Sequence, residues 1–202
     1  MGNRIIAIFG GSFNPPIISH FSLAEQILEN YKNVEKIIFL PVNANYNKSG
    51  LIENEYRYEM LKLGCKNQPN FEVLDIELKN EAQAYTIDTL NQIQKMYKDK
   101  EIYFILGTDN LKQLEHWNKS EQLVKKYKFY VLQRDDDIFE NIIENSTFLK
   151  ENKKAFINLE NIKRITLSSS LIRGKIINGE DTKGLIPEEI EEYIKNNNLY
   201  KN

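Results

Sequence analysis

Short, uninterrupted apolar runs alternate along this chain with longer stretches in which apolar residues recur every three or four positions. An apolar run without polar alternation is typical of a strand buried on both faces, as in a parallel sheet. The three- and four-residue spacing is typical of a helix that buries one face. The alternation predicts an α/β fold: a Rossmann-like, doubly wound parallel sheet with a small C-terminal helical portion.

These two patterns locate the elements. Strands are predicted at 4–9, 36–42, 71–78, 101–106 and 128–133, with a last strand at 162–167. Helices are predicted at 18–31, 53–66, 86–97, 110–126 (in one or two pieces), 169–177 and 187–197. Ser19 is a candidate N-cap for the first helix. We expect a single domain over residues 1–202: a Rossmann-like core at 1–134, a variable excursion of helix and loop at 135–160, and a C-terminal segment at 161–202.

Composition supports a globular protein. The 202 residues are 41% hydrophobic and 28% charged, so wholesale disorder is excluded. The net charge of -2 argues against a protein that holds nucleic acid electrostatically. No run approaches the ~18 apolar residues of a membrane span, and the N-terminus does not resemble a signal peptide. We therefore expect no nucleic-acid or membrane partner, while the oligomeric state, a homo-oligomer included, stays open.

Cysteine and histidine are scarce. The single cysteine, Cys65, cannot form an internal disulfide, which fits a reducing compartment and a cytoplasmic location. The two histidines, His20 and His116, are too few for a histidine-rich zinc site. We therefore expect no metal site built from protein side chains.

Three unusual short segments each follow a predicted strand, at residues 10–20, 107–110 and 167–173. The carboxyl ends of parallel strands lie at one edge of a sheet, where open α/β sheets bind their ligands. We therefore expect the three segments to converge on one site.

The first segment reads GGSFNPPIISH. Gly10 and Gly11 allow the backbone to turn closely and to present amide donors to a phosphate chain. His20 falls in the first turn of the predicted helix, where backbone amides and the helix dipole favour anions. The glycines by themselves also fit a plain strand-to-helix turn with a surface histidine, because their spacing is neither GxGxxG nor a P-loop.

The other two segments add polar side chains. Asp109 lies just past a buried strand, where it can contact a ligand or cap a helix. The sequence SSSLIR places three hydroxyls and Arg173 in one helical turn, a combination suited to phosphate. Arginine is scarce, with five residues against twenty-two lysines, which makes Arg173 a stronger candidate than a lysine would be.

Together these motifs resemble those of the nucleotidyltransferase superfamily, which carries an (H/T)xGH motif after its first strand and an ISSTxxR motif near its C-terminus. Further segments are similar to those of bacterial nicotinate-mononucleotide adenylyltransferases. In chain order they are Pro41 with Lys48, RYEM at 57–60, YTIDTL at 85–90, FILGTDNL at 104–111 with Trp117, Gln133 with Arg134, and LIPEEIEEYIKNNNLY at 185–200. The set covers almost the whole chain in the family's order and is specific, although no single segment is.

The resemblance implies a nucleotidyltransferase domain that transfers AMP from ATP to nicotinate mononucleotide, giving nicotinate adenine dinucleotide and pyrophosphate in NAD biosynthesis. Mg²⁺ would be carried on the ATP phosphates. The mononucleotide phosphate would attack the α-phosphorus in line, so the protein would act by positioning and charge stabilisation.

The resemblance also implies residue roles. The catalytic residues would be His20, Arg173 and Lys48. The ATP-binding residues would be Gly10, Gly11, Ser12, Phe13, His20, Gly107, Asp109, Ser168, Ser169, Ser170 and Arg173. The mononucleotide-binding residues would be Lys48, Tyr85, Thr86, Trp117 and Arg134. From the residues alone, Trp117 fits equally a core or interface position, and Tyr85 fits packing at a helix start.

The first motif departs from the family pattern GGTFDPPHxGH. Ser12 replaces Thr, Asn14 replaces Asp, Ser19 replaces Gly, and Ile17 stands where the first histidine belongs. An aliphatic side chain cannot donate to a phosphate oxygen, and the loss of one such donor costs about 10²–10³ in rate. The alternative function is therefore a catalytically weak or inactive relative that acts as a nucleotide-binding module. The retained motifs for both substrates favour the enzyme.

Overall fold

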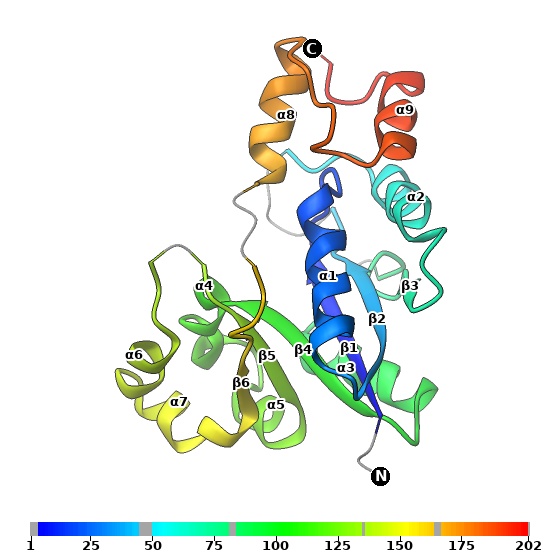
Figure 1. Ribbon diagram of the computed structural model, residues 1–202. Helices are drawn as coiled ribbons and strands as arrows, with labels where there is room; N and C mark the ends of the chain where they lie inside the picture. The colour runs from blue at the N-terminus through cyan, green and yellow to red at the C-terminus, as the bar shows by residue number, and fades with distance from the viewer. Residues whose placement is uncertain (1–3, 45–49, 81–83, 135, 164–166, 202) are drawn as a thin grey trace.

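The computed structural model describes residues 4–44, 50–80, 84–134, 136–163 and 167–201 (Figure 1). Within these ranges six strands form one parallel sheet in the order β3-β2-β1-β4-β5-β6. The strands are β1 (Ile5–Gly11), β2 (Val34–Pro41), β3 (Phe71–Val73), β4 (Glu101–Gly107), β5 (Lys128–Leu132) and β6 (Phe156–Asn158). The chain starts in the middle of the sheet and winds outward in both directions, which confirms the predicted doubly wound fold.

Helices cover both faces of the sheet (Figure 1). One face packs against α1 (Ile18–Asn30) and α2 (Asn54–Cys65), and α8 (Ser169–Ile177) and α9 (Glu188–Asn196) extend the same hydrophobic cluster beyond the strand ends. The other packs against α3 (Thr86–Met96), α5 (Ser120–Lys126), α6 (Phe139–Glu144) and α7 (Thr147–Glu151). In β1, Ile5, Ala7 and Phe9 join the first core, while Ile6 and Ile8 join the second. This two-sided burial is the reason that the strand is apolar throughout.

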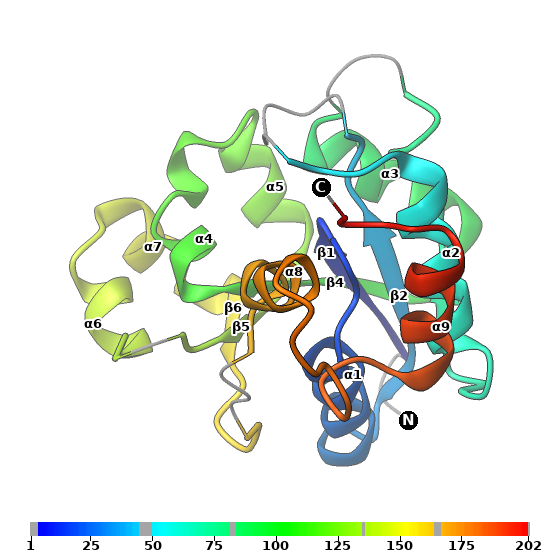
Figure 2. The same cartoon turned by 90° about the horizontal axis from the view of Figure 1, so that it is seen from above.

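The carboxyl ends of the strands form one edge, which Figure 2 views from above. Here α8 lies over the middle of the edge, close to the ends of β1 and β4. The short helix α4 (Thr108–Leu111) begins directly after β4 at the same edge. No helix in the described ranges has the length and apolar character needed to cross a bilayer.

The last strand is not where the sequence predicted it. The sixth strand is Phe156–Asn158, inside the stretch expected to hold only helix and loop. It pairs with β5, and Phe156 is buried there. Residues 162, 163 and 167 belong to no strand, and 164–166 lie outside the described residues. Ile162 supplied a misleading apolar signal, because it packs into the core from an irregular segment.

Other element boundaries also differ. β3 stops at Val73, because the chain then turns so that the N–H groups of Leu78 and Lys79 donate to Asp75 O. The helix predicted at 110–126 is divided into α4, a 3₁₀ turn (Leu114–His116) and α5. Ser19 lies inside α1, whose N-cap is Ile17.

Ile17 is a core residue. Its side chain is 0% exposed and packs in the cluster on the α1 face of the sheet. Its backbone caps α1 reciprocally with His20. The N–H of Ile17 donates to His20 Nδ1 at 3.0 Å, and the N–H of His20 donates to Ile17 O at 3.0 Å. His20 therefore performs the local capping that Ser19 was predicted to provide.

Arg57 is a fully buried cation on α2. Its guanidinium donates to Ser12 O at 2.8 Å, Val42 O at 2.6 Å, Ile52 O at 3.1 Å and Asn54 Oδ1 at 2.6 Å. Burial lowers the pKa of Arg57 to about 10, which leaves it charged at neutral pH. One side chain thus joins the loops that follow β1 and β2 to the start of α2.

We expect Arg57→Lys to lower the free energy of unfolding by about 3 kcal/mol, because one ammonium cannot satisfy four acceptors spread around a planar fork and leaves buried carbonyls unpaired. Arg4→Lys is the control, since Arg4 is exposed and its contact with Glu35 is long at 3.4 Å. Denaturant unfolding measures both variants. Equal stability of the two variants would contradict the structural role given to Arg57.

We expect Ile17→His to lower the free energy of unfolding by about 3 kcal/mol, because it places an imidazole in an apolar site without a partner. Ile17→Val, which removes only one methyl group, should cost about 1 kcal/mol. Thermal and urea unfolding compare the two. A histidine variant as stable as the valine variant would mean that position 17 faces solvent or the ligand cavity.

Candidate active site

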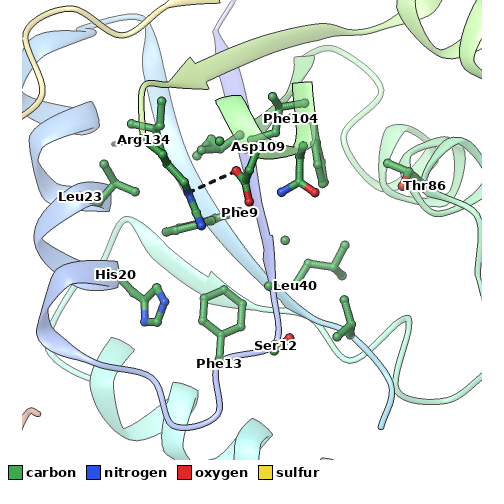
Figure 3. Close-up of a pocket in the computed structure, with 18 of the residues that line it drawn as sticks. Phe9, Ser12, Phe13, His20, Leu23, Leu40, Thr86, Phe104, Asp109 and Arg134 are labelled. Carbon is green, nitrogen blue, oxygen red and sulfur yellow. Dashed lines mark ion pairs between the residues drawn. The ribbon is translucent and has the colours of Figure 1, made fainter. Parts of the chain in front are cut away.

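A cavity of about 1250 Å³ opens at the carboxyl ends of β1, β2, β4 and β5 (Figure 3). It lies where the strand order reverses, between β1 and β4. All three segments singled out in the sequence contribute to its lining, so their predicted convergence is confirmed. The volume exceeds the roughly 300–1,000 Å³ of a site for one small molecule, which leaves room for two ligands side by side.

The loop after β1 approaches its neighbours closely. A Cβ atom on Gly10 would lie 2.9 Å from Phe104 Cζ, and one on Gly11 would lie 3.0 Å from Phe13 Cζ. Phe13 has a φ of 46°, a left-handed conformation that is costly for a non-glycine residue. Its buried ring holds that conformation by packing against Phe9 and His20. Gly10, Gly11, Ser12 and Phe13 all line the cavity.

His20 lines the cavity from the first turn of α1. Its ring packs edge-on against Phe13 and Phe9, with centroids 5.1 and 6.0 Å apart. Burial, and secondarily the Arg134 guanidinium, lowers the pKa of His20 to about 4, so the ring is neutral at pH 7. Because Nδ1 accepts the Ile17 N–H, the ring proton is on Nε2. His20 can therefore offer a ligand one neutral N–H donor.

Asp109 and Arg134 meet above the end of β4 (Figure 3). Arg134 Nε lies 3.3 Å from Asp109 Oδ1, and both side chains are more than half exposed. Such a pair adds little to stability, so both groups are available to a ligand. The Arg134 N–H also donates to Thr108 Oγ1 at 3.0 Å, which anchors the residue beside α4. A Cβ atom on Gly107 would come within 2.5 Å of both side chains, so any larger residue would have to displace this pair.

Tyr85, Thr86 and Trp117 line another part of the cavity. Trp117 packs edge-on against Phe104 with centroids 6.3 Å apart, and its loop reaches α3 through Lys119, whose Nζ lies 3.4 Å from Asp88 Oδ1. Figure 3 shows Thr86 on the opposite side of the view from His20 and Arg134. The cavity thus has a His20 end and a Trp117 end, named here for these two residues.

The SSSLIR segment docks onto the loop after β1. Ser168 caps α8 by accepting the N–H of Leu171, and Ser169 Oγ donates to Pro15 O at 2.8 Å. Both serines line the cavity. Arg173 instead donates to Asn14 O at 2.7 Å and to Ser170 Oγ at 3.1 Å. Arg173 and Ser170 are not among the described residues that line the cavity, so their predicted contact with phosphate stays a prediction.

Lys48 lies outside the described residues, and its assigned role also stays a prediction. Sequence reasoning missed several residues of the site region, among them Glu77 and Tyr200. Glu77 lines the cavity as a buried carboxyl, and nothing in the segment FEVLDIEL distinguished it from its neighbours. Tyr200 donates to Asn14 Oδ1 at 2.8 Å. The segment at 185–200, which resembles the family's, ends in Tyr200. It marked this tyrosine as a family feature but did not indicate its contact with Asn14.

Comparisons with known proteins identify the family. The model of the cytidylyltransferase-like family matches residues 8–175. A probable nicotinate-nucleotide adenylyltransferase of Lachnoclostridium phytofermentans is 36% identical over 98% of this chain and 99% of its own length. One of Fusobacterium nucleatum is 38% identical over 94% and 96%.

Solved structures give the same fold. The nicotinic acid mononucleotide adenylyltransferase of Plasmodium falciparum, complexed with NaAD, matches with a TM-score of 0.78 and 24% identity over 98% of this chain and 97% of that one. With relatives above 30% identity along nearly their full length, and with the predicted motifs gathered around one cavity, the chain belongs to the nicotinate-nucleotide adenylyltransferase family of nucleotidyltransferases.

Proposed function

We propose that this protein transfers AMP from ATP to nicotinate mononucleotide and so forms nicotinate adenine dinucleotide and pyrophosphate. The observation that carries the proposal is the single large cavity, which joins a polar His20 end to an aromatic Trp117 end. The names of the relatives and the NaAD complex of the Plasmodium falciparum enzyme support the same pair of substrates.

The reaction makes one bond and breaks one. A phosphate oxygen of nicotinate mononucleotide attacks the α-phosphorus of ATP, and the bond from that phosphorus to the oxygen bridging the α- and β-phosphates breaks. Pyrophosphate leaves with the electron pair. No covalent bond to the protein is needed, so the protein contributes alignment and donors for the oxygens on which charge develops.

The His20 end is suited to the ATP phosphates. Gly10, Gly11, Ser12 and Phe13 supply the loop after β1, and His20 supplies a neutral N–H. Ser168 and Ser169 face the same end, with Ser170 and Arg173 behind them. Gly107 and Asp109 would meet the adenosine ribose. We propose that Arg173 binds phosphate once ATP is present. Its guanidinium would then leave Asn14 O and turn toward the ATP phosphates.

The Trp117 end is suited to the pyridine ring. The indole of Trp117 can stack on the ring, while Tyr85 and Thr86 close the pocket at the start of α3, where free amides favour a carboxylate. Arg134, which the resemblance groups with the mononucleotide, lies beside Asp109 and His20. Its charge is therefore placed to act on the phosphates between the two substrates, and we assign Lys48 to the mononucleotide phosphate.

Nucleotidyltransferases generally use a divalent metal with the nucleoside triphosphate. No group of three His, Cys, Asp or Glu side chains among the described residues is placed to hold a metal ion. The side chains present therefore fit a cation that ATP brings with it, held by phosphate oxygens and water. We propose Mg²⁺ in that role, where it would neutralise charge on the leaving pyrophosphate. The free, buried Cys65 supports our proposal of a cytoplasmic location.

The alternative, a nucleotide-binding module without chemistry, rests on Ile17. That side chain is buried in the core, so it neither blocks the cavity nor replaces the absent histidine. Arg134 lines the cavity and can offer a cation to phosphates there, and Tyr85, Thr86 and Trp117, which we assign to the second substrate, line it too. Both features favour the enzyme.

We expect purified protein to release pyrophosphate with ATP, Mg²⁺ and nicotinate mononucleotide, and to form the dinucleotide in equal amount. Mass spectrometry of the product, with a control that omits the mononucleotide, separates adenylyl transfer from ATP hydrolysis. Saturable ATP binding without dinucleotide formation would instead establish the nucleotide-binding module.

We expect His20→Asn to lower kcat by about 10²–10³ while leaving the melting temperature nearly unchanged, because the short amide keeps an acceptor for the Ile17 N–H but loses the Nε2 donor. His20→Ala should lose both, with the same drop in kcat and about 1 kcal/mol of stability. Steady-state kinetics and thermal unfolding give the two readouts. Wild-type turnover in His20→Asn would remove Nε2 from the mechanism.

A further inference from the structure

Glu77 is a buried carboxyl that the proposed reaction leaves without a role. Glu77 is only 6% exposed, yet it lines the cavity. Its Oε1 accepts a hydrogen bond of 3.0 Å from Thr89 Oγ1, and Thr89 is itself buried. In the described part of the chain, Thr89 is the one donor to this carboxyl group. Glu77 thus lines a ligand cavity while Thr89 holds its carboxyl.

The position of Thr89 shows which part of the cavity Glu77 meets. Thr89 and Thr86 are three residues apart on α3 and therefore lie on the same face of the helix. The Glu77 carboxyl is accordingly placed at the first turn of α3, next to the part of the cavity that Thr86 lines. This is the Trp117 end, where the proposed function places the pyridine ring.

The backbone around Glu77 is fixed by the side-chain amides of the buried Asn43 and the half-buried Asn54. Asn43 Nδ2 donates to Leu78 O at 3.2 Å and to Asn80 O at 2.7 Å. Asn54, on α2, lies 3.5 Å from Leu78 O through its own Nδ2. The turn that carries Glu77 is therefore held against the end of β2 and the start of α2.

Two carboxylates close to Glu77 among the described residues are paired with lysines. Asp75 in the same turn pairs with Lys79 at 2.9 Å, and on α3 Asp88 pairs with Lys119 at 3.4 Å. Asn43, which follows β2, and Asn54 on α2 are neutral, but Asn54 Oδ1 accepts from the buried cation Arg57 at 2.6 Å, so this guanidinium lies one side chain away from the turn. The remaining titratable side chains at this end of the cavity are Tyr85, His116 and the Glu115 that lies 3.6 Å from His116.

This setting makes the charge of Glu77 easy to change. Burial raises the pKa of Glu77 to about 7, and the hydrogen bond from Thr89 acts in the opposite direction. Below that value the group is neutral and its O–H can donate. Above it the group is an anion that only accepts.

We infer that Glu77 interacts with the carboxylate or amide substituent on the pyridine ring and so determines the preference between nicotinate and nicotinamide mononucleotide. The inference rests on the proposed function. A neutral Glu77 donates its proton to the nicotinate carboxylate, which the amide anchors around Thr86 also favour. An ionised Glu77 repels that carboxylate and accepts an N–H from the nicotinamide amide. The preference for the acid therefore falls as pH rises through neutrality.

The measurement is the ratio of dissociation constants for the two mononucleotides, obtained by calorimetry at pH 6 and pH 8. Both ligands carry the same ribose phosphate, so the titration of that phosphate cancels in the ratio. We expect the preference for the acid to fall about tenfold between the two pH values, equivalent to ~1.4 kcal/mol.

Three variants make the test specific to this carboxyl. Glu77→Gln keeps an acceptor for Thr89 but carries no charge, so its ratio should be independent of pH. Thr89→Val keeps the shape of the side chain but removes the hydrogen bond that lowers the pKa of Glu77. The preference for the acid should therefore fall at a higher pH than in the wild-type protein. His116→Gln is the matched control for the other titratable group and should keep the wild-type dependence.

Each outcome decides the question. A wild-type ratio that does not change with pH, or a pH-dependent ratio that survives in Glu77→Gln, overturns the inference. Equal loss of affinity for both ligands in Glu77→Gln would show that the carboxyl is only structural. If Glu77→Gln unfolds, Thr89→Val supplies the decisive comparison. If the wild-type protein binds neither mononucleotide, the proposed function fails first and the inference with it.

Discussion

The buried guanidinium of Arg57 is the constraint on which the geometry of the site depends. A buried donor left without an acceptor costs about 1–3 kcal/mol, and this group donates to carbonyl oxygens from three separate segments, at Ser12, Val42 and Ile52. The loops after β1 and β2 and the start of α2 must therefore hold their places together. The loop after β1 connects Gly10 and Gly11, at the end of the strand, to His20 in α1, and all three residues line the cavity. The hydrogen bond from Arg57 to Ser12 O thus fixes the conformation of this loop in the absence of a ligand.

A second layer of hydrogen bonds extends this constraint to the C-terminus. Asn14 is buried, and its side-chain amide, its side-chain oxygen and its backbone carbonyl all form hydrogen bonds. It donates to Gly50 O at 2.8 Å, accepts from Tyr200 Oη at 2.8 Å, and its carbonyl accepts from Arg173 at 2.7 Å. The family pattern has a carboxylate at this position. The neutral Asn keeps an acceptor for Tyr200 and gains a donor for Gly50 O, so this departure from the pattern is accommodated by the surroundings.

The sequence predicted what depends on local pattern and missed what depends on distant partners. The uninterrupted apolar runs identified β1, β2, β4 and β5, because a strand buried on both faces has no polar position to obscure it. The pattern failed at β6, whose three residues are too short to show a period, and at Ile162, which is apolar without being in a strand. In the site, the motifs located the loop after β1 and Asp109. They could not show that Arg173 bonds to Asn14 O or that Glu77 meets Thr89, since these contacts join residues 159 and 12 positions apart.

The charges of the cavity explain how the site can work with isoleucine in place of its first histidine. A histidine with a pKa of about 4 acts as a neutral donor, and in this fold a second histidine at position 17 would lie in the apolar core rather than at the cavity. The formal positive charge comes instead from Arg134, which the loop after β5 holds over the end of β4 through Thr108. The low pKa of His20 follows partly from that same guanidinium. Burial is the larger cause of that low pKa and the Arg134 charge the smaller one, and together they keep His20 neutral, with Nδ1 accepting from the Ile17 N–H and Nε2 carrying the ring proton. The protonation state of His20 thus depends both on its hydrogen bond with the Ile17 N–H and on the charge of Arg134.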